Sequence, residues 1–363
     1  MGWLLKTANC LTNIYCEPIL CYLLNLQIYT PISTAVPPNG QAVNNADIYV
    51  KFWGVRGSVP TPISPKSLED KIIHLLMGSH GRDVSTPKAA LSYLNEQSVF
   101  QRTTIGGNTS CVEVRAGDQH FVFDCGSGLK ELGWSLMKEA FGKGQGKIQI
   151  FMSHTHWDHI LGFPFFVPAY IPGNEITIYG AHSNLKKRFT NQHHPYNFPQ
   201  PLSIMRSNIQ FKKLTPDRQK HFGKVTVKPI LLDHPGDSYA YRIEYNNHVF
   251  VYASDGAYNN PSPEVMEKFH LFYQNADLRI FDAFFDLIES FEKNDWGHST
   301  SFLGVDIALK AGVKNLLLFH HAPLSDDWRL GKFLEGTRRY LNHVAPNTDL
   351  KVDIAYEGLV CTL

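Results

Sequence analysis

The feature that most constrains this chain is a histidine-rich motif placed directly after an apolar strand. The segment KIQIFMS, residues 147–153, leads into His154-Thr155-His156-Trp157-Asp158-His159. Four potential ligands within six residues cannot all point one way from a regular strand or helix, but they converge if the chain turns sharply around a cation. Imidazole and carboxylate groups together suit Zn, Mn or Fe. A histidine-rich surface loop is the alternative, and the position at a strand end disfavours it.

Short apolar strands dominate the rest of the chain beyond residue 47. The pattern predicts strands at IYVKFWGV, SCVEVRA, HFVFDCG, KIQIFMSH, EITIYGA, IQFKKL, KVTVKPILL, YAYRIEYN, HVFVYASDG, LRIFDA, LLLFHH and LKVDIAYEG. Helices are predicted over 129–140 and 301–311, and the order of elements is roughly repeated in the two halves. This order favours an α/β fold in which two β-sheets pack face to face with helices outside.

Composition excludes some classes of function. The 363 residues carry a formal net charge of +1, so no strong field recruits nucleic acid or an anionic membrane. The local clusters Lys186–Arg188 and Lys212-Lys213 are typical of solvated surface. Six cysteines form no CxxC pair, which favours buried free thiols and a cytoplasmic protein. No run of about 18 apolar residues is present, so no transmembrane helix is predicted.

The first 46 residues are set apart from the rest. Residues 1–46 are predicted to be a poorly ordered N-terminal extension and linker, ending in the Pro-, Asn- and Gly-rich stretch 33–47. A leader peptide and translated upstream sequence are the alternatives. Residues 47–363 are predicted to form one domain, with a helical insert near 63–103. Deletion of residues 1–40 is expected to leave activity nearly unchanged.

Five motifs, in order along the chain, resemble those of metallo-β-lactamase-fold hydrolases. HTHWDH is similar to the family's HxHxDH signature, and FVFDCGSGL to its early strand–Asp–Gly motif, with Asp124. DHPGDSYAYRI, VYASDG and LLLFHHAPLSDD resemble the later motifs and supply His234, Asp255 and His320. The resemblance implies an αββα sandwich of two packed mixed β-sheets. Asp233 departs from the family pattern, and His321 stays an alternative to His320.

The resemblance implies two divalent metal ions, with Zn expected first and Mn or Fe as alternatives. One site would use the three imidazoles of His154, His156 and His234. The other would use one carboxylate and two imidazoles, from Asp158, His159 and His320. The carboxylate of Asp255 would bridge the two metals. A hydroxide shared by the two metals would attack phosphorus. Asp158 is thus counted among both the catalytic and the metal-binding residues, and Asp124 is expected to hold the metal loop through hydrogen bonds instead of ligating a metal.

Three further motifs narrow the branch to phosphodiesters. WGVRGSVPTP and GGNTSCVEV resemble phosphoribosyl cyclic phosphodiesterases and cyclic-nucleotide-degrading enzymes. WGHSTS resembles the HST motif of tRNA 3′-processing endonucleases and implies that His298 is the general acid. The alternative is that His298 is a core or helix-cap residue whose hydrogen bonds are satisfied within the fold, since Ser299 and Thr300 next to it are natural N-cap residues.

The expected substrate is a small cyclic phosphodiester or cyclic nucleotide. Four residues are candidates for binding it: Arg56, Ser58, Asn108 and Thr109. A turn role is at least as well supported for Asn108, which follows two glycines. An RNA-processing endonuclease and a non-hydrolytic metal-binding module are the competing functions. Near-zero net charge and the lack of a recognisable tRNA-gripping arm disfavour the first of these, and the resemblance allows a homodimer.

Overall fold

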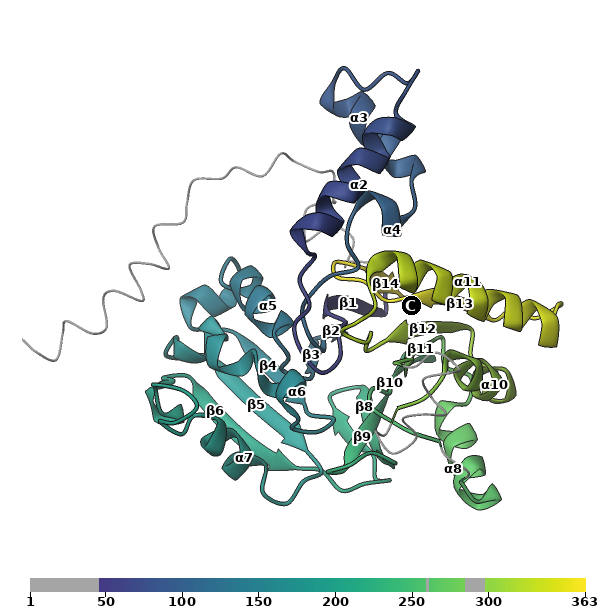
Figure 1. Cartoon of the computed structure of the whole chain (residues 1–363). Coiled ribbons are helices and arrows are strands. Elements are labelled where there is room, and N and C mark those ends of the chain that lie inside the picture. Colours follow the sequence, from purple (N-terminus) through teal and green to yellow (C-terminus); the bar gives the residue numbers. More distant parts are fainter. Residues whose placement is uncertain (1–45, 259–260, 285–297) are drawn as a thin grey trace, which may run out of the picture. The chain divides into compact units, whose positions relative to one another are not determined.

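The fold places two β-sheets face to face (Figure 1). The computed structural model describes residues 46–258, 261–284 and 298–363, so the predicted extension lies almost wholly outside the described residues. The first sheet has seven strands in the order β14 (Val360–Thr362), β1 (Ile48–Gly54), β2 (Cys111–Ala116), β3 (Gln119–Phe123), β4 (Lys147–Phe151), β5 (Glu175–Gly180) and β6 (Asn208–Lys213). The second also has seven, in the order β13 (Lys351–Ile354), β12 (Asn315–Phe319), β11 (Leu278–Asp282), β10 (His248–Tyr252), β9 (Ser238–Tyr245), β8 (Val225–Leu232) and β7 (Lys220–Phe222).

Both sheets are mixed and follow the same scheme. Strands β14, β1, β2 and β3 pair antiparallel, and β3, β4, β5 and β6 then pair parallel. In the second sheet β7 to β10 pair antiparallel and β10 to β13 pair parallel. The predicted αββα sandwich of two mixed sheets is therefore confirmed.

Aromatic side chains fill the space between the sheets. Phe123 of β3 stacks on Tyr252 of β10 with ring centroids 5.3 Å apart, and Phe151 of β4 meets Tyr241 of β9 at 5.5 Å. All four rings are completely buried. Such rings bury large apolar areas, and they fix the sheets against each other at the strand ends that carry the polar motifs.

Helices cover the outer faces. On the first sheet, α5 (Gly128–Leu136) and α7 (Leu185–Gln192) contribute to an apolar cluster with β4 and β5. On the second, α10 (Ser301–Ala311) contacts β11 and β12, α11 (Asp327–Val344) contacts β13, and α8 (Pro263–Tyr273) contacts α10.

Helix α11 was missed in the sequence, although its signals are present. Asp326 accepts a hydrogen bond from the backbone N–H of Arg329, as a helix N-cap does. The buried positions Leu330, Leu334 and Leu341 recur at helical spacing.

Three helices fill the stretch in which the sequence indicated a helical insert. They are α2 (Pro65–Gly78), α3 (Pro87–Glu96) and the short α4 (Val99–Arg102). The buried ammonium of Lys71 pairs with Asp327 at 3.0 Å and donates to the carbonyl of Thr103 at 2.9 Å, which holds the base of the insert against the start of α11.

Two further sequence features can be located in the described part of the chain. Cys111, Cys125 and Cys361 are free thiols, the first two of them buried. None of the helices in the described ranges combines the length and the apolar character that crossing a membrane requires.

Candidate metal centre

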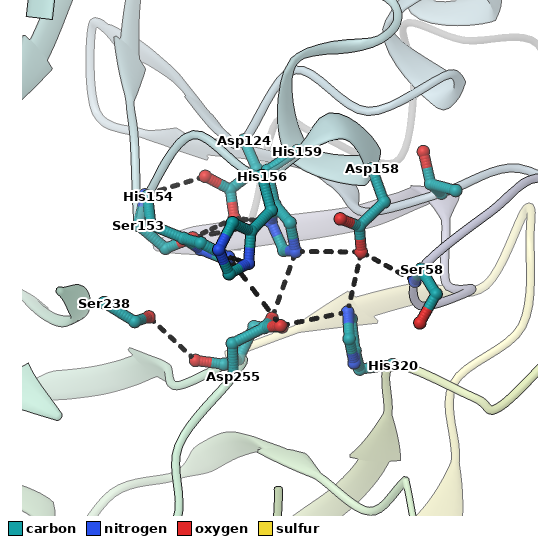
Figure 2. A network of polar contacts seen from close by, with 12 residues as sticks. Ser58, Asp124, Ser153, His154, His156, Asp158, His159, Ser238, Asp255 and His320 are labelled. Atoms are coloured by element: carbon teal, nitrogen blue, oxygen red, sulfur yellow. Dashed lines mark hydrogen bonds and ion pairs between the residues drawn. The ribbon is translucent and has the colours of Figure 1, made fainter. Parts of the chain in front are cut away.

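The polar motifs meet where the carboxyl ends of parallel strands converge (Figure 2). His154 follows β4, Asp124 follows β3, and His320 follows β12. Asp255 lies three residues beyond β10, and His234 lies in the loop between β8 and β9. Asp124 and His154 follow neighbouring parallel strands of the first sheet, whereas Asp255 and His320 follow strands of the second, so the packing of the two sheets brings together residues from both halves of the chain.

Three of these residues have a left-handed backbone. The φ angles are +62° at Asp124, +49° at Asp255 and +60° at His320. Non-glycine residues rarely adopt this conformation, and here it turns each side chain off its strand and into the cluster. Local strain of this kind, at three positions of one site, indicates that the surrounding fold imposes the arrangement.

The first donor group consists of three imidazoles. His154, His156 and His234 each offer a ring nitrogen to a common point. Nδ1 of His156 lies 2.9 Å from Nε2 of His154 and 3.2 Å from Nε2 of His234. These are three of the six residues that were expected to divide between two metal sites, and the structure brings their rings together.

The second donor group mixes carboxylates and imidazoles. It contains Asp158, His159, Asp255 and His320. Oδ2 of Asp158 lies 3.2 Å from Nε2 of His159 and 3.0 Å from Nε2 of His320. All four residues are buried.

Asp255 lies between the two groups. Its Oδ2 is 3.1 Å from Nε2 of His159, and its Oδ1 is 3.2 Å from Nε2 of His320. Oδ1 is also 3.9 Å from Nε2 of both His154 and His234. The carboxylate therefore faces the first group with one oxygen and the second group with both.

Asp124 supports the cluster without joining either donor group. Its Oδ2 accepts hydrogen bonds from Nδ1 of His159 at 2.8 Å, from Tyr252 at 2.7 Å and from the Ser153 hydroxyl at 2.6 Å. Its Oδ1 accepts from the Ser153 backbone N–H at 2.7 Å. A carboxylate on Nδ1 fixes the tautomer of His159 and leaves Nε2 as the donor atom.

Asp282 is a site residue that the sequence analysis missed. It ends β11, and its Oδ2 accepts a hydrogen bond from Nδ1 of His298 at 2.7 Å. Its Oδ1 lies 3.6 Å from Nδ1 of His320. The ring of His298 also stacks on Phe284 at 4.3 Å. The signal was an acid at the end of a buried strand, LRIFD, the same pattern that singled out Asp124.

His320, and not His321, faces the cluster. Nε2 of His321 points away and donates to the carbonyl of Ala355 at 2.8 Å. The His320 ring packs against Gly57, where an added Cβ would come within 2.5 Å of the imidazole. Glycine at this position leaves the space that the His320 ring occupies.

The four candidate substrate-binding residues differ in their surroundings. Ser58 is exposed beside the cluster, and its backbone N–H donates to Oδ2 of Asp158 at 2.7 Å. The buried Arg56 guanidinium instead donates to the carbonyls of Gly106 and Ser325, at 2.7 and 2.6 Å.

Asn108 and Thr109 make loop contacts. The Asn108 amide bonds to Glu357 at 3.1 Å and accepts from Ser127 at 2.9 Å. Thr109 accepts from the Ser127 backbone at 2.8 Å. Three of the four candidates thus have their polar atoms engaged in holding loops.

Imidazoles are the near neighbours of both carboxylates in the buried cluster. Burial alone would raise the pKa of Asp255, but the imidazoles of His320, His159 and His154 hold it well below its usual range. Burial would lower the pKa of His320, yet Asp255, Asp158 and Asp282 raise it to about 10. In the described part of the chain no Lys or Arg pairs with Asp158 or Asp255, and Nε2 of His159 has no hydrogen bond. The mixed imidazole and carboxylate set fits divalent transition metals.

Known proteins resemble the chain in sequence. The profile of the family described as Beta-lactamase superfamily domain matches residues 119–321, more than half of the chain. Ribonuclease Z of Thermoplasma acidophilum is 25% identical over 287 residues, which cover 66% of this chain and 88% of that protein.

Solved structures share the fold. The metallo-beta-lactamase fold protein YhfI from Bacillus subtilis superposes with a TM-score of 0.57 at 20% identity, covering 86% of this chain and 98% of its own. Unliganded yeast PDE1 has a TM-score of 0.57 at 13% identity, covering 88% of this chain and 100% of its own. The chain belongs to the beta-lactamase superfamily, and it is a hydrolase of the metallo-β-lactamase fold.

Proposed function

We propose that this chain hydrolyses phosphodiesters at a centre of two divalent metal ions, with zinc as the first candidate. The observation that carries the proposal is the sharing of Asp255 between two adjoining donor groups. His154, His156 and His234 would hold one ion, and Asp158, His159 and His320 the other, with Asp255 between them. When bound, two such ions lower the pKa of water and take up negative charge on the phosphoryl oxygens.

The residues of the chain supply orientation and a proton. Asp124 fixes the ring of His159, and the backbone N–H of Ser58 fixes the carboxylate of Asp158. His298 would protonate the leaving oxygen from Nε2, because Asp282 accepts from Nδ1 and sets the tautomer. Asp282 is a positioning residue in this scheme.

Two substrates of the same chemistry are in question. A small cyclic phosphodiester is the first, because a net charge of +1 provides little general attraction for a polyanion. Precursor tRNA, from which the 3′ extension would be removed, is the second candidate substrate. The sequence relatives named Ribonuclease Z favour it.

One set of assays separates these activities. The purified protein would be supplied with Zn²⁺ or Mn²⁺ and tested on cyclic nucleotides, bis(p-nitrophenyl) phosphate and precursor tRNA. Hydrolysis that is abolished by a chelator and restored by metal supports the proposal. Metal binding without hydrolysis of any of the three would leave a non-hydrolytic metal-binding module and would overturn it.

A further inference from the structure

Arg188 of α7 is placed beside the first donor group. Its Nη1 donates to the hydroxyl of Thr155 at 2.9 Å, and its Nε donates to Asn184 at 3.0 Å. Thr155 lies between His154 and His156 in the chain, so Arg188 is hydrogen-bonded to the segment that carries two of the three imidazoles. Among the described residues no carboxylate forms an ion pair with Arg188. An arginine held in place without an anionic partner can offer its remaining N–H groups to a phosphate.

Arg188 differs in this respect from its neighbours in the basic run. Lys186 and Lys187 are exposed, whereas Arg188 is half-buried. Its charge also acts on two groups outside α7. Burial lowers the pKa of His182 and raises that of Tyr239, and the positive charge of Arg188 has a smaller, lowering effect on both. The side chain therefore lies near His182 and Tyr239 as well as Thr155.

Trp157 lies on the same rim and is 61% exposed. It opens the short helix α6 (Trp157–Ile160), between His156 and Asp158. An exposed indole presents a flat aromatic face, and such faces are the usual platforms for nucleobases. Its neighbours on both sides in the chain are donor residues of the cluster, so a ring stacked on Trp157 would lie next to the reacting phosphate.

Two hydrogen bonds hold α7 along the segment that carries Trp157. One is the contact of Arg188 with Thr155, and the other runs from the amide of Gln192 to the carbonyl of Ile160 at 2.7 Å. Gln192 is buried, which makes this second contact a fixed part of the fold. Helix α7 is therefore fastened to both ends of the segment from Thr155 to Ile160, which includes Trp157.

We propose that Arg188 and Trp157 form a nucleotide subsite, in which the guanidinium binds a phosphate oxygen and the indole stacks on the base. The inference deepens the proposed phosphodiesterase function and rests on it. It narrows the substrate to a phosphodiester that carries a nucleobase. Such a group is present both in a cyclic mononucleotide and at the 3′ region of an RNA strand, and the experiment distinguishes these two sources.

The test compares two substrates with the same leaving group. Thymidine 5′-(p-nitrophenyl phosphate) carries a nucleoside, and methyl p-nitrophenyl phosphate does not. The wild-type protein loaded with Zn²⁺ or Mn²⁺ should show a higher kcat/KM for the nucleoside ester. Trp157→Ala should lower kcat/KM roughly 5- to 100-fold for that ester only, the usual effect of removing one stacking platform. Trp157→Phe should recover most of the loss, because it keeps a flat aromatic face.

Arg188 is tested with a matched charge control. Arg188→Gln should raise KM for both esters, since both contain the phosphate, while Lys187→Gln removes the same charge from the same helix and should leave kinetics unchanged. Equal kcat/KM of the two esters in the wild-type protein would overturn the proposal. Equal losses on both esters in Trp157→Ala would also overturn it, because they would mean that the indole only shapes the metal loop.

Binding provides a readout that is independent of turnover. Titration calorimetry with adenosine 5′-monophosphate should show binding to the wild-type protein and at least 5-fold weaker binding to Trp157→Ala. If neither ester is hydrolysed but the nucleotide still binds, the proposed function is refuted and the subsite is retained. Hydrolysis of the methyl ester with no nucleotide binding would refute the subsite alone. The kcat/KM of Trp157→Ala is then measured on a cyclic nucleotide and on a short RNA. The substrate on which the substitution lowers kcat/KM identifies the source of the base.

Discussion

Oδ2 of Asp282 lies 2.7 Å from Nδ1 of His298, and this pair stands at the edge of the donor cluster. The other oxygen of Asp282 faces Nδ1 of His320 at 3.6 Å. One carboxylate therefore touches both a proposed metal ligand and the proposed proton donor. Asp255, Asp282, His298 and His320 could also hold a cation themselves. The first experiments have to separate these roles.

Replacement of His298 by alanine should leave both metals in place and lower turnover about 10²- to 10⁴-fold, the usual worth of a positioned acid. The loss should be large for a ribose alkoxide leaving group and small for nitrophenolate, which leaves without a proton. Asp282→Asn should give a smaller loss with the same dependence on the leaving group. Kinetics on a cyclic nucleotide and a nitrophenyl ester, with metal analysis, check this. Loss of one metal equivalent in His298→Ala would instead make His298 a ligand.

Asp255→Ala should reduce occupancy of both metal sites, because Asp255 faces both donor groups. Elemental analysis after gentle purification should approach two equivalents per chain in the wild-type protein and fall well below that in the variant. Asp233→Asn is the matched control, because this substitution removes an exposed carboxylate next to His234. Full occupancy by two metals in Asp255→Ala would show that this residue does not bridge.

His320→Ala should lose metal and activity, whereas His321→Ala should keep both. His321 is completely buried and donates to Ala355, and burial, followed by the charge of Arg56, lowers its pKa to about 3. Its removal should therefore lower the melting temperature without changing metal content. Metal analysis and thermal unfolding of the two variants decide the point, and the reverse pattern would place the ligand at 321.

Glu113→Gln should make stability less dependent on acid pH. Burial opposes ionisation of Glu113, but His120, Arg115 and Trp53 lower its pKa from 4.5 to about 2. A lowered folded-state pKa stabilises the fold above the unfolded pKa, and the contribution is lost as pH falls from 4.5 to about 2. At neutral pH it is worth about 3 kcal/mol at most, at 1.36 kcal/mol per pKa unit.

The measurement for Glu113 is the free energy of unfolding of the metal-free proteins between pH 2 and 7. The difference between wild type and Glu113→Gln should be largest above pH 5 and should shrink at lower pH. A difference that is independent of pH would mean that the variant acts through packing and not through the charge.

Much of the centre could be predicted because its signals are local in the chain. A strand followed by HTHWDH places four potential ligands within six residues, and the short motifs that resemble those of metallo-β-lactamase-fold hydrolases pointed to His234, Asp255 and His320. Strand periodicity likewise predicted the paired sheets, since burial of alternate residues is written directly into the sequence. In the structure these side chains lie in two adjoining clusters of potential ligands.

Roles that depend on contacts between distant segments were decided only by the tertiary structure. The sequence marked Arg56 as a pocket group, but packing turns its guanidinium to the carbonyls of Gly106 and Ser325.

Asp282 and Arg188 were not assigned a role, because their contacts with His298 and Thr155 join separate elements of the fold. The choice between His320 and His321 also depends on a left-handed φ of +60°, which the register of β12 and the space beside Gly57 impose. The sequence determined which kinds of side chain are available, and sheet register and packing determined which of them meet.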